Sequence, residues 1–189
     1  MYEDGHARAA AQEYLGHIQR WLQERFSQQK LSILDAGCQA GRLLIPLAQD
    51  GHRLIGIDTS GFALRRTKQH ARESRLPVQL HRGSIAKLRR WVAPESLDAV
   101  VCTEVLYLCP DHDALLTLLT DSVKPGGLLC VSHRPVQFYA AIALKQGRPD
   151  QAMSVMERSE GPSPSGAYHN WQSQEQLVRL YRDRGLALL

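Results

Sequence analysis

The chain has 189 residues, of which 43% are hydrophobic and 22% are charged, a composition typical of one globular domain. It contains no run of about 18 apolar residues, and its first residues mix charged with apolar side chains, so the pattern favours neither a membrane span nor a signal peptide. The cysteines show no CxxC pair and no Cys/His cluster, which predicts reduced thiols in the cytoplasm rather than disulfides or a zinc site; they are Cys38, Cys102, Cys109 and Cys130.

Helix-like and strand-like segments alternate along the chain. Apolar residues at helical spacing predict a first helix over residues 6–27. Apolar runs then predict strands at Leu31–Leu34, Arg53–Asp58, Val78–Ser84, Leu97–Glu104 and Leu128–Ser132. Between and after the strands we predict helices at Leu43–Ala48, Phe62–Ser74, His112–Ser122 and in the C-terminal stretch, with the segment "KPGG" as a turn before the fifth strand.

This alternation predicts an α/β fold with a doubly wound, mostly parallel sheet flanked by helices. In such sheets ligands bind beyond the carboxyl ends of the strands, beside the first strand. The candidate site residues are therefore the polar and small residues at strand ends: Asp35, Gly37, Asp58, Ser84, Thr103, Glu104, Ser132 and His133.

The stretch "ILDAGCQAGRL" has the form of a turn from a buried strand into a helix. Gln39 lies between Gly37 and Gly41, so the G-x-G-x-x-G fingerprint of dinucleotide sites is not met. The Asp35 carboxylate would repel a pyrophosphate, whereas Asp58, 23 residues further on, is placed to accept hydrogen bonds from two ribose hydroxyls. An adenosine compound with a positive charge fits this turn better than a dinucleotide.

Five segments in register resemble the class I S-adenosylmethionine-dependent methyltransferases, which have a Rossmann-like fold. "LDAGCQAG" is similar to the first motif of that family, and "LIGIDTS", "RGSI", "LDAVVCTEVLYL" and "VKPGGLLCVS" are similar to the next four. The resemblance covers roughly Lys30 to Ser132, and the C-terminal helix gives a weaker echo. It implies an enzyme that uses S-adenosyl-L-methionine.

The resemblance also implies a set of cofactor-binding residues. The acid and the glycine backbone after the first strand would hold the methionine end, the acid after the second strand the ribose, and the residues after the third strand the adenine. Two positions depart from the family pattern: Gln39 replaces the middle glycine, and Ser84 replaces an acid that bonds the adenine amino group. The implied cofactor-binding set is Asp35, Gly37, Cys38, Gly41, Asp58, Thr59, Ser84, Ile85 and Thr103.

Methyl transfer from a sulfonium depends mainly on positioning the acceptor, although a protonated oxygen or nitrogen acceptor also needs a base. His133 follows the fifth strand directly and is our candidate catalytic base at the pocket rim. Tyr107 is interpreted as a core residue. Tyr168, His169 and Trp171 lie on an expected flap. We predict no metal site, because the run Asp111, His112 and Asp113 has the form of a polar helix start.

We expect one methyltransferase-like domain over residues 1–189, with the N-terminal helix at 6–27 and a cofactor-binding core at 30–134. An insertion at 135–171 follows, and then a C-terminal helix and strand at 172–189. Gly and Pro in Ser159–Asn170 favour a flap that closes over the cofactor, with a disordered linker as the alternative. The hairpin that closes the sheet in the family is missing, so the C-terminal strands are incomplete, and we favour a domain cut from a longer protein.

Three functions remain open, and methyl transfer to a small molecule is favoured. The second is a degenerate domain that binds cofactor or a protein partner without catalysis, for which Gln39 and the missing strands are the evidence. The third is a nucleic-acid methyltransferase. It rests on residues 61–90, where nine Lys/Arg face one Glu, but an aromatic-rich base-holding pattern is lacking. The acceptor and the oligomeric state are left open.

Overall fold

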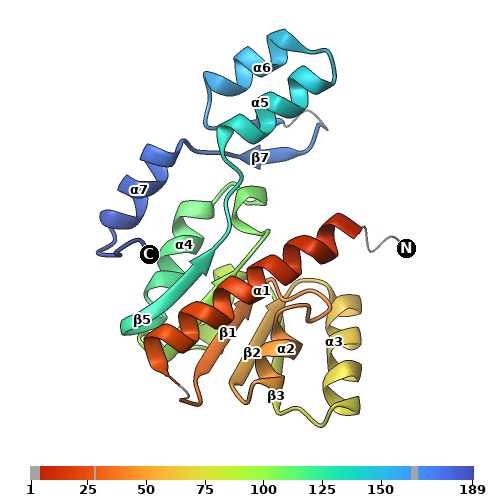
Figure 1. Cartoon of the computed structure of the whole chain (residues 1–189), viewed down its shortest axis with the longest axis vertical. Helices are drawn as coiled ribbons and strands as arrows, with labels where there is room; N and C mark the ends of the chain where they lie inside the picture. Colours follow the sequence, from red (N-terminus) through yellow and green to blue (C-terminus); the bar gives the residue numbers. More distant parts are fainter. Residues whose placement is uncertain (1–4, 28, 163–165) are drawn as a thin grey trace. The chain divides into compact units, whose positions relative to one another are not determined.

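The computed structural model describes residues 5–27, 29–162 and 166–189, with side chains from Ala9 onward. Figure 1 shows the elements in chain order. They are α1 (Gly5–Phe26), β1 (Ser32–Ala36), α2 (Leu44–Gln49), β2 (Arg53–Asp58), α3 (Gly61–Glu73), β3 (Val78–Arg82), η1 (Ile85–Arg90), β4 (Leu97–Cys102), η2 (Leu106–Leu108), α4 (His112–Thr120), β5 (Val123–Val131), α5 (Val136–Lys145), α6 (Pro149–Met156), β6 (Glu160–Pro162), β7 (Tyr168–Asn170) and α7 (Gln174–Arg182).

The main sheet has five strands in the order β3-β2-β1-β4-β5. β1 pairs in parallel with β2 on one side and β4 on the other, and β2 pairs in parallel with β3. The connections from β1 therefore run in opposite directions along the sheet, which makes the carboxyl ends of β1 and β4 the topological switch point. The predicted α/β class and the doubly wound, mostly parallel sheet are confirmed.

The chain divides into two compact units. The first unit comprises Met1–Cys102 and Asp121–Cys130, and the second comprises Thr103–Thr120 and Val131–Leu189. Each unit is described separately below. The prediction of one methyltransferase-like domain over residues 1–189 stays a prediction.

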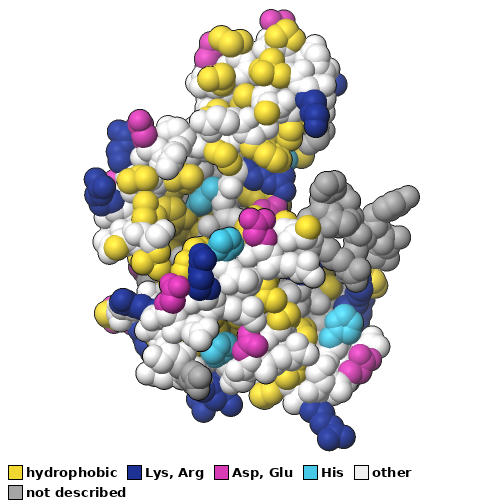
Figure 2. Space-filling view, viewed as in Figure 1, with side chains coloured by type: hydrophobic (Ala, Val, Ile, Leu, Met, Phe, Trp, Pro, Cys, Tyr) yellow, Lys and Arg dark blue, Asp and Glu magenta, His cyan; other side chains and the backbone are white. Residues whose placement is uncertain are grey.

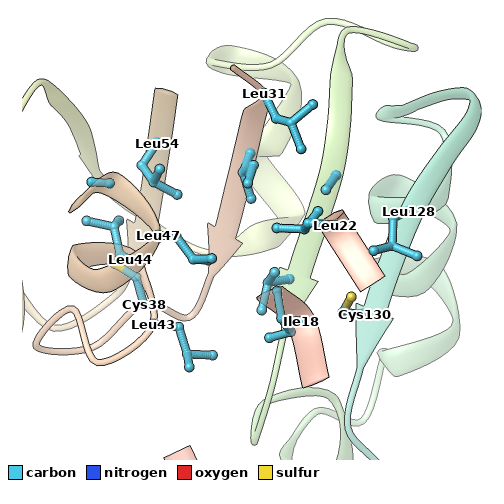
Figure 3. Packing of buried hydrophobic residues seen from close by; sticks show 14 of the residues in the cluster. Ile18, Leu22, Leu31, Cys38, Leu43, Leu44, Leu47, Leu54, Leu128 and Cys130 are labelled. Atoms are coloured by element: carbon cyan, nitrogen blue, oxygen red, sulfur yellow. The ribbon is translucent and has the colours of Figure 1, made fainter. Parts of the chain in front are cut away.

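The core of the first unit is built on strands that are buried on both faces. All but one residue of β1 and all but one of β4 are buried, as expected for central strands of a parallel sheet. Ile18 and Leu22 of α1 join Leu128 and Cys130 of β5 in this core (Figure 3). Burial of these side chains, worth about 1.5–3 kcal/mol for each large aliphatic residue, holds the strand ends of this unit in place.

The second unit has a small core of its own. Tyr139 and Ala143 of α5, Ala152 and Val155 of α6, and Trp171 after β7 form it. The two short strands β6 and β7 pair antiparallel, with Gly161 opposite His169.

The α5–α6 pair exposes several large apolar side chains. Its exposed large side chains include Leu144, Met153 and Met156, and hydrophobic side chains gather over these helices in Figure 2. No helix in the described part of the chain is both long and apolar enough to span a membrane.

Three predicted features differ from the structure. The segment "KPGG" was predicted as a turn but lies within the nine-residue strand β5, where Gly126 takes a φ of +77° and a Cβ on Gly127 would lie 2.8 Å from the Asp98 carbonyl oxygen. These glycines therefore serve an irregular strand and not a separate turn. The strand expected in 172–189 is also absent, because the described residues after α7 form turns and irregular chain. In the expected flap, residues 163–165 lie outside the described residues, and the described ends form β6 and β7.

Candidate functional site

The loop after β1 is held in an unusual backbone conformation. Gly37, Gln39 and Gly41 have φ angles of +86°, +45° and +82°. The amides of Gly37 and Cys38 both donate to the carbonyl oxygen of Ile57, at 2.8 and 3.1 Å, which ties the loop to β2. A Cβ on Gly41 would lie 2.9 Å from side-chain carbons of two neighbours, so only glycine fits at this position.

Gln39 takes a left-handed backbone conformation, which glycine adopts most readily. Left-handed backbone costs an L-residue about 1–2 kcal/mol, and two hydrogen bonds offset that cost here. The Gln39 amide donates to Oδ2 of Asp58 at 2.8 Å, and its carbonyl accepts from Oγ1 of Thr67 at 2.8 Å. The residue itself is exposed. The departure from the family pattern therefore leaves the loop backbone in place.

Asp58, the last residue of β2, links the loop after β1 to the loop after β2. Its Oδ2 accepts from Gln39, and its Oδ1 accepts from the amide of Ser60 at 2.7 Å. Thr59 next to it is exposed. Each carboxylate oxygen can accept more than one hydrogen bond, so Asp58 keeps acceptor capacity for a ligand. The structure thus joins two loops that carry predicted site residues. Gly37, Cys38 and Gly41 lie in the loop after β1, and Asp58 and Thr59 lie at the end of β2.

Asp35 is a buried acid with 3% exposure. Burial raises its pKa from 3.8 to about 7, the nearby charge of Asp58 adds to the rise, and a hydrogen bond from the Leu44 amide opposes it. Cys38 beside it is also buried, and burial together with the two acids raises the pKa of its thiol, which makes a nucleophilic role for Cys38 unfavourable. A buried acid with so strongly shifted a pKa is a candidate functional-site residue.

The residues after β3 form a cap and an aromatic stack. Ser84 is the N-cap of η1 and accepts from the Ala86 amide at 3.2 Å, while Ile85 is buried. The rings of His81 and Trp91 stack at 5.1 Å, and a Cβ on Gly83 would lie 2.5 Å from the indole of Trp91. Sequence reasoning missed this Trp91 contact, because no motif couples a residue after η1 to the strand end.

The second unit carries a charged cluster that follows β4 and β5. Thr103, the remaining predicted cofactor residue, is the first residue of this unit, and Glu104 follows it with a φ of +61°. Glu104 accepts from the hydroxyls of Tyr107 at 2.7 Å and Ser132 at 3.3 Å, and it pairs with Arg134 at 2.5 Å. The Ser132 hydroxyl also accepts from the Glu104 amide, which fixes the left-handed backbone.

Arg134 and its aromatic neighbours were not predicted as site residues. Its guanidinium carbon lies 4.4 Å from the ring centre of Tyr107 and 5.0 Å from that of Phe138. Arg134 follows His133 directly, and strand-end reasoning singled out only His133. Only the folded chain shows that Glu104, 30 residues earlier, pairs with Arg134.

His133, predicted at a pocket rim, is half-buried in the structure. Its Nε2 is 2.5 Å from the Tyr181 hydroxyl of α7, and the two rings meet edge to face. Burial lowers the pKa of His133 to about 4, with a smaller contribution from His112. A histidine with so low a pKa is a weak base near neutral pH. The amphipathic helix α7 contributes to the burial of His133, because its Tyr181 side chain packs against the His133 ring.

The flap residues that we expected over a ligand are mostly core residues. Trp171 is 2% exposed, and its indole N–H donates to the carbonyls of Val155 and Arg158. His169 is buried and stacks on Tyr107 with ring centres 5.7 Å apart. Trp171, which we expected on a flap, is therefore a residue of the small core of the second unit.

The described residues contain no group of three His, Cys, Asp or Glu side chains arranged to hold a metal ion. The four cysteines are free thiols.

A family model described as a methyltransferase domain matches residues 27–178. The ubiquinone biosynthesis O-methyltransferase of Leptothrix cholodnii is 28% identical over 89% of this chain and 69% of its own length. The protein of the same name from Stutzerimonas stutzeri is 34% identical over 57% of this chain and 46% of its own length, so the chain spans about half of that relative.

Two solved structures show the same fold. Magnesium protoporphyrin IX methyltransferase from Synechocystis PCC 6803, with bound S-adenosylhomocysteine, has a TM-score of 0.69 at 21% identity and covers 94% of this chain and 74% of its own. An S-adenosylmethionine-dependent methyltransferase from Methanosarcina mazei has a TM-score of 0.67 at 22% identity and covers 88% and 82%.

The site and the fold define a Rossmann-like methyltransferase, a class of enzyme that takes its methyl group from S-adenosylmethionine. The chain belongs to the methyltransferase domain family.

Proposed function

We propose that this chain transfers a methyl group from S-adenosylmethionine to a small-molecule acceptor. The observation that carries the proposal is the buried acid Asp35 beside a loop whose backbone is tied to Asp58. The names of the relatives from L. cholodnii and Synechocystis refer to small organic acceptors, which supports the same acceptor class here.

The charge of the cofactor suits Asp35. A positively charged ligand stabilises the ionised form of a buried acid, and an acid with a pKa of about 7 becomes fully charged when such a ligand binds. We propose that Asp35, Cys38 and the Gly37 and Gly41 backbone hold the methionine end of the cofactor. The Gly41 backbone can approach closely because it lacks a Cβ.

The remaining cofactor contacts follow the strand ends. We propose that Asp58 accepts hydrogen bonds from the two ribose hydroxyls, with Thr59 beside them. Ser84 and Ile85 would border the adenine ring, and the backbone of Thr103 would contact the amino group of the cofactor. The expected flap over Ser159–Asn170 remains a proposal.

S-adenosylmethionine, when bound, supplies a methyl group on a sulfonium sulfur, which is a good leaving group. The protein's part is then to orient the acceptor and exclude water, which can contribute most of the rate. We place no proton transfer on His133, because the Tyr181 hydroxyl occupies its Nε2 and burial lowers its pKa to about 4.

A labelling experiment tests the acceptor class. Protein is incubated with methyl-labelled S-adenosylmethionine and a cell extract that has been divided into small-molecule, protein and nucleic-acid fractions. We expect label in the small-molecule fraction with wild type and at least a tenfold loss with Asp58→Ala. Asp121→Ala, which removes an exposed acid paired with Arg89, is the matched control. Label found only in protein or nucleic acid would overturn the small-molecule proposal.

Neither the family match nor the loop geometry supports a domain without catalysis. A nucleic-acid acceptor has only the basic residues of 61–90 in its favour. We further propose that the protein works in a reducing cytoplasm, because all four cysteines are free and three of them are buried.

A further inference from the structure

Residues 61–90 concentrate positive charge in one part of the first unit. They contain nine Lys/Arg and one Glu, whereas the rest of the chain contains 14 Lys/Arg and 18 Asp/Glu. The single acid, Glu73, accepts a hydrogen bond from the side chain of Gln69 at 2.9 Å. One carboxylate cannot compensate nine cations, so the surface of this segment should attract anions.

Three of these cations form a row along one face of α3, the helix beside β2 and β3 (Figure 1). Arg65, Lys68 and Arg72 are three and four residues apart, which makes them neighbours on one helix face, and all three are exposed. None of the three forms an ion pair with a described carboxylate. Leu64 and Ala71 on the apolar face of α3 are buried, so the helix is fixed to the unit and presents the row to solvent.

Further cations extend the row at both ends. Gly61 lies on the same face, one turn before Arg65, and a Cβ on Gly61 would be 3.3 Å from the guanidinium carbon of Arg82. Arg82, the last residue of β3, therefore continues the row beyond the start of α3. Arg75, which is exposed, follows the C-cap of α3 at the other end. The basic row consists of Arg82, Arg65, Lys68, Arg72 and Arg75.

An exposed aromatic ring lies beside the start of the basic row. Phe62 is 52% exposed, and the guanidinium carbon of Arg65 is 5.9 Å from its ring centre. Proteins that bind single-stranded nucleic acid combine cations along the phosphate backbone with aromatic rings on which bases stack. A helix that binds a membrane surface instead turns its apolar face to the lipid, and the apolar face of α3 is buried. The arrangement favours a single strand over a lipid surface.

We propose that the basic row and Phe62 form a docking surface for single-stranded nucleic acid. The cations contact phosphates of the backbone, and the Phe62 ring stacks on one base. Such contacts depend on charge and on the face of a base, so they carry little sequence preference. All of these residues belong to the first unit. The docking surface is independent of the proposed methyl transfer, because the strand is a binding partner and not the methyl acceptor.

Fluorescence anisotropy with a labelled oligouridylate strand tests the docking surface on the intact chain. We expect micromolar binding at low salt and a loss of about fiftyfold between about 50 and about 200 mM salt, because four or five phosphate contacts give a slope of log affinity against log salt of about −3. A duplex of the same length should bind more weakly, since its bases cannot stack on Phe62. Absence of binding at low salt, a flat salt response or tighter binding of the duplex would overturn the proposal.

A triple variant removes the centre of the basic row. Arg65→Gln, Lys68→Gln and Arg72→Gln are combined, because glutamine is a good helix former and should leave the melting temperature unchanged. Arg82 is kept, since its Nε lies 3.4 Å from the carbonyl oxygen of Thr59 in the proposed cofactor site. We expect the triple variant to bind the strand at least thirtyfold more weakly at low salt and with about half the salt slope.

A second triple variant is the matched control. It combines Lys145→Gln, Arg179→Gln and Arg182→Gln, three exposed cations of α5 and α7, and it changes the net charge by the same amount. The control should bind the strand like wild type. Equal losses in the two triple variants would show that only net charge matters and would refute a docking surface on α3.

Phe62→Ala tests the stacking contact separately from the charge. We expect at least fivefold weaker binding of the oligouridylate with an unchanged salt slope, because stacking on a ring releases no counterions. An affinity equal to that of wild type would refute the assignment to a single strand.

Two further measurements on the same samples separate the alternatives. Sedimentation with vesicles of phosphatidylglycerol and phosphatidylcholine should give the same result for wild type and the first triple variant. Vesicle binding that depends on the basic row, without binding of the strand, would replace the nucleic acid by a lipid surface. Calorimetry with S-adenosylhomocysteine reports on the proposed function: cofactor binding without strand binding refutes only the docking surface, and strand binding without cofactor binding refutes only the proposed function.

Discussion

In the cofactor-free protein, the ionised form of Asp35 is unfavourable because the carboxyl is buried in the first unit. Its folded pKa of about 7 lies above the unfolded value of 3.8, so the folded state holds a proton that the unfolded state has released. The Asp35 contribution to the free energy of unfolding is therefore fully present below about pH 4 and is lost as the pH rises through about 7. The same carboxylate that destabilises the free protein is suited to a cationic ligand.

Asp35→Asn should remove this pH dependence. We expect urea unfolding of the cofactor-free variant to give a free energy of unfolding higher than wild type at pH 8, by an amount on the order of 4 kcal/mol, and nearly equal to wild type near pH 3.5. Asp50→Asn, an exposed acid after α2, serves as the control. A variant that is equally stable or less stable than wild type at both pH values would show that Asp35 is not destabilising.

Gln39 and Gly41 allow a direct comparison of two left-handed positions. The Gln39 side chain is exposed, and the hydrogen bond to Asp58 comes from the Gln39 backbone amide. Gln39→Ala should therefore change the affinity for S-adenosylhomocysteine less than about threefold. Gly41→Ala forces a Cβ to within 2.9 Å of Ile45 and Thr67, and we expect a loss of stability of about 2 kcal/mol and at least tenfold weaker binding. Calorimetry checks both, and similar affinities for the two variants would contradict the assignment of backbone roles in this loop.

At the scale of elements, the short helix η2 depends on one buried amide. Asn170 of β7 is 1% exposed, and its Nδ2 donates to the carbonyls of Leu106 at 2.8 Å and Cys109 at 3.0 Å. This side chain connects β7 to η2, and η2 carries Tyr107. The stacked pair of Tyr107 and His169 therefore depends on an amide that no local sequence pattern singles out.

Asn170→Ala should destabilise the protein by about 2–3 kcal/mol, because two buried carbonyls lose their donor. We expect faster amide hydrogen exchange in η2 and a lower urea midpoint. Gln137→Ala, an exposed position on α5, should cost less than about 0.5 kcal/mol. An Asn170 variant as stable as this control would mean that the two carbonyls find water instead.

The elements themselves were largely predictable from the sequence. Apolar runs identified all five strands of the main sheet. The clearest runs are those of β1 and β4, which are buried on both faces and contain few polar residues. The turn chemistry of "KPGG" was misleading, because Gly126 and Gly127 also suit an irregular strand with close backbone contacts. The pair β6 and β7 was missed, since strands of three residues carry no period.

The candidate site was predictable only where it is local. The acid, glycine and strand-end positions of the first unit follow from short motifs, and Asp58 follows from its distance along the chain to Asp35. The cluster of the second unit unites Glu104 with Arg134 and Tyr107 with His169, pairs that are widely separated in sequence. Sequence reasoning chose His133 because it follows the predicted fifth strand, and it could not foresee the contact between His133 and Tyr181 of α7.

At the scale of the whole molecule, the proposed function depends on cofactor binding. A ligand that binds only the folded chain stabilises it, by about 2.7 kcal/mol when its concentration is one hundred times the Kd. The two acids Asp35 and Asp58 should respond differently when they are changed. Loss of Asp58 removes the hydrogen bond from the Gln39 backbone amide and the proposed hydrogen bonds from the ribose, so it should weaken binding without the gain in stability expected for Asp35→Asn.

Calorimetric titration of S-adenosylhomocysteine into wild type and Asp58→Ala tests this claim most directly. We predict a single site with a micromolar Kd for wild type and a ten- to one hundredfold weaker Kd for Asp58→Ala, since a charge-assisted hydrogen bond contributes about 1.5–3 kcal/mol. Asp121→Ala should bind like wild type. No heat of binding with wild type, or equal affinities for wild type and Asp58→Ala, would contradict the assignment of this loop as the cofactor site.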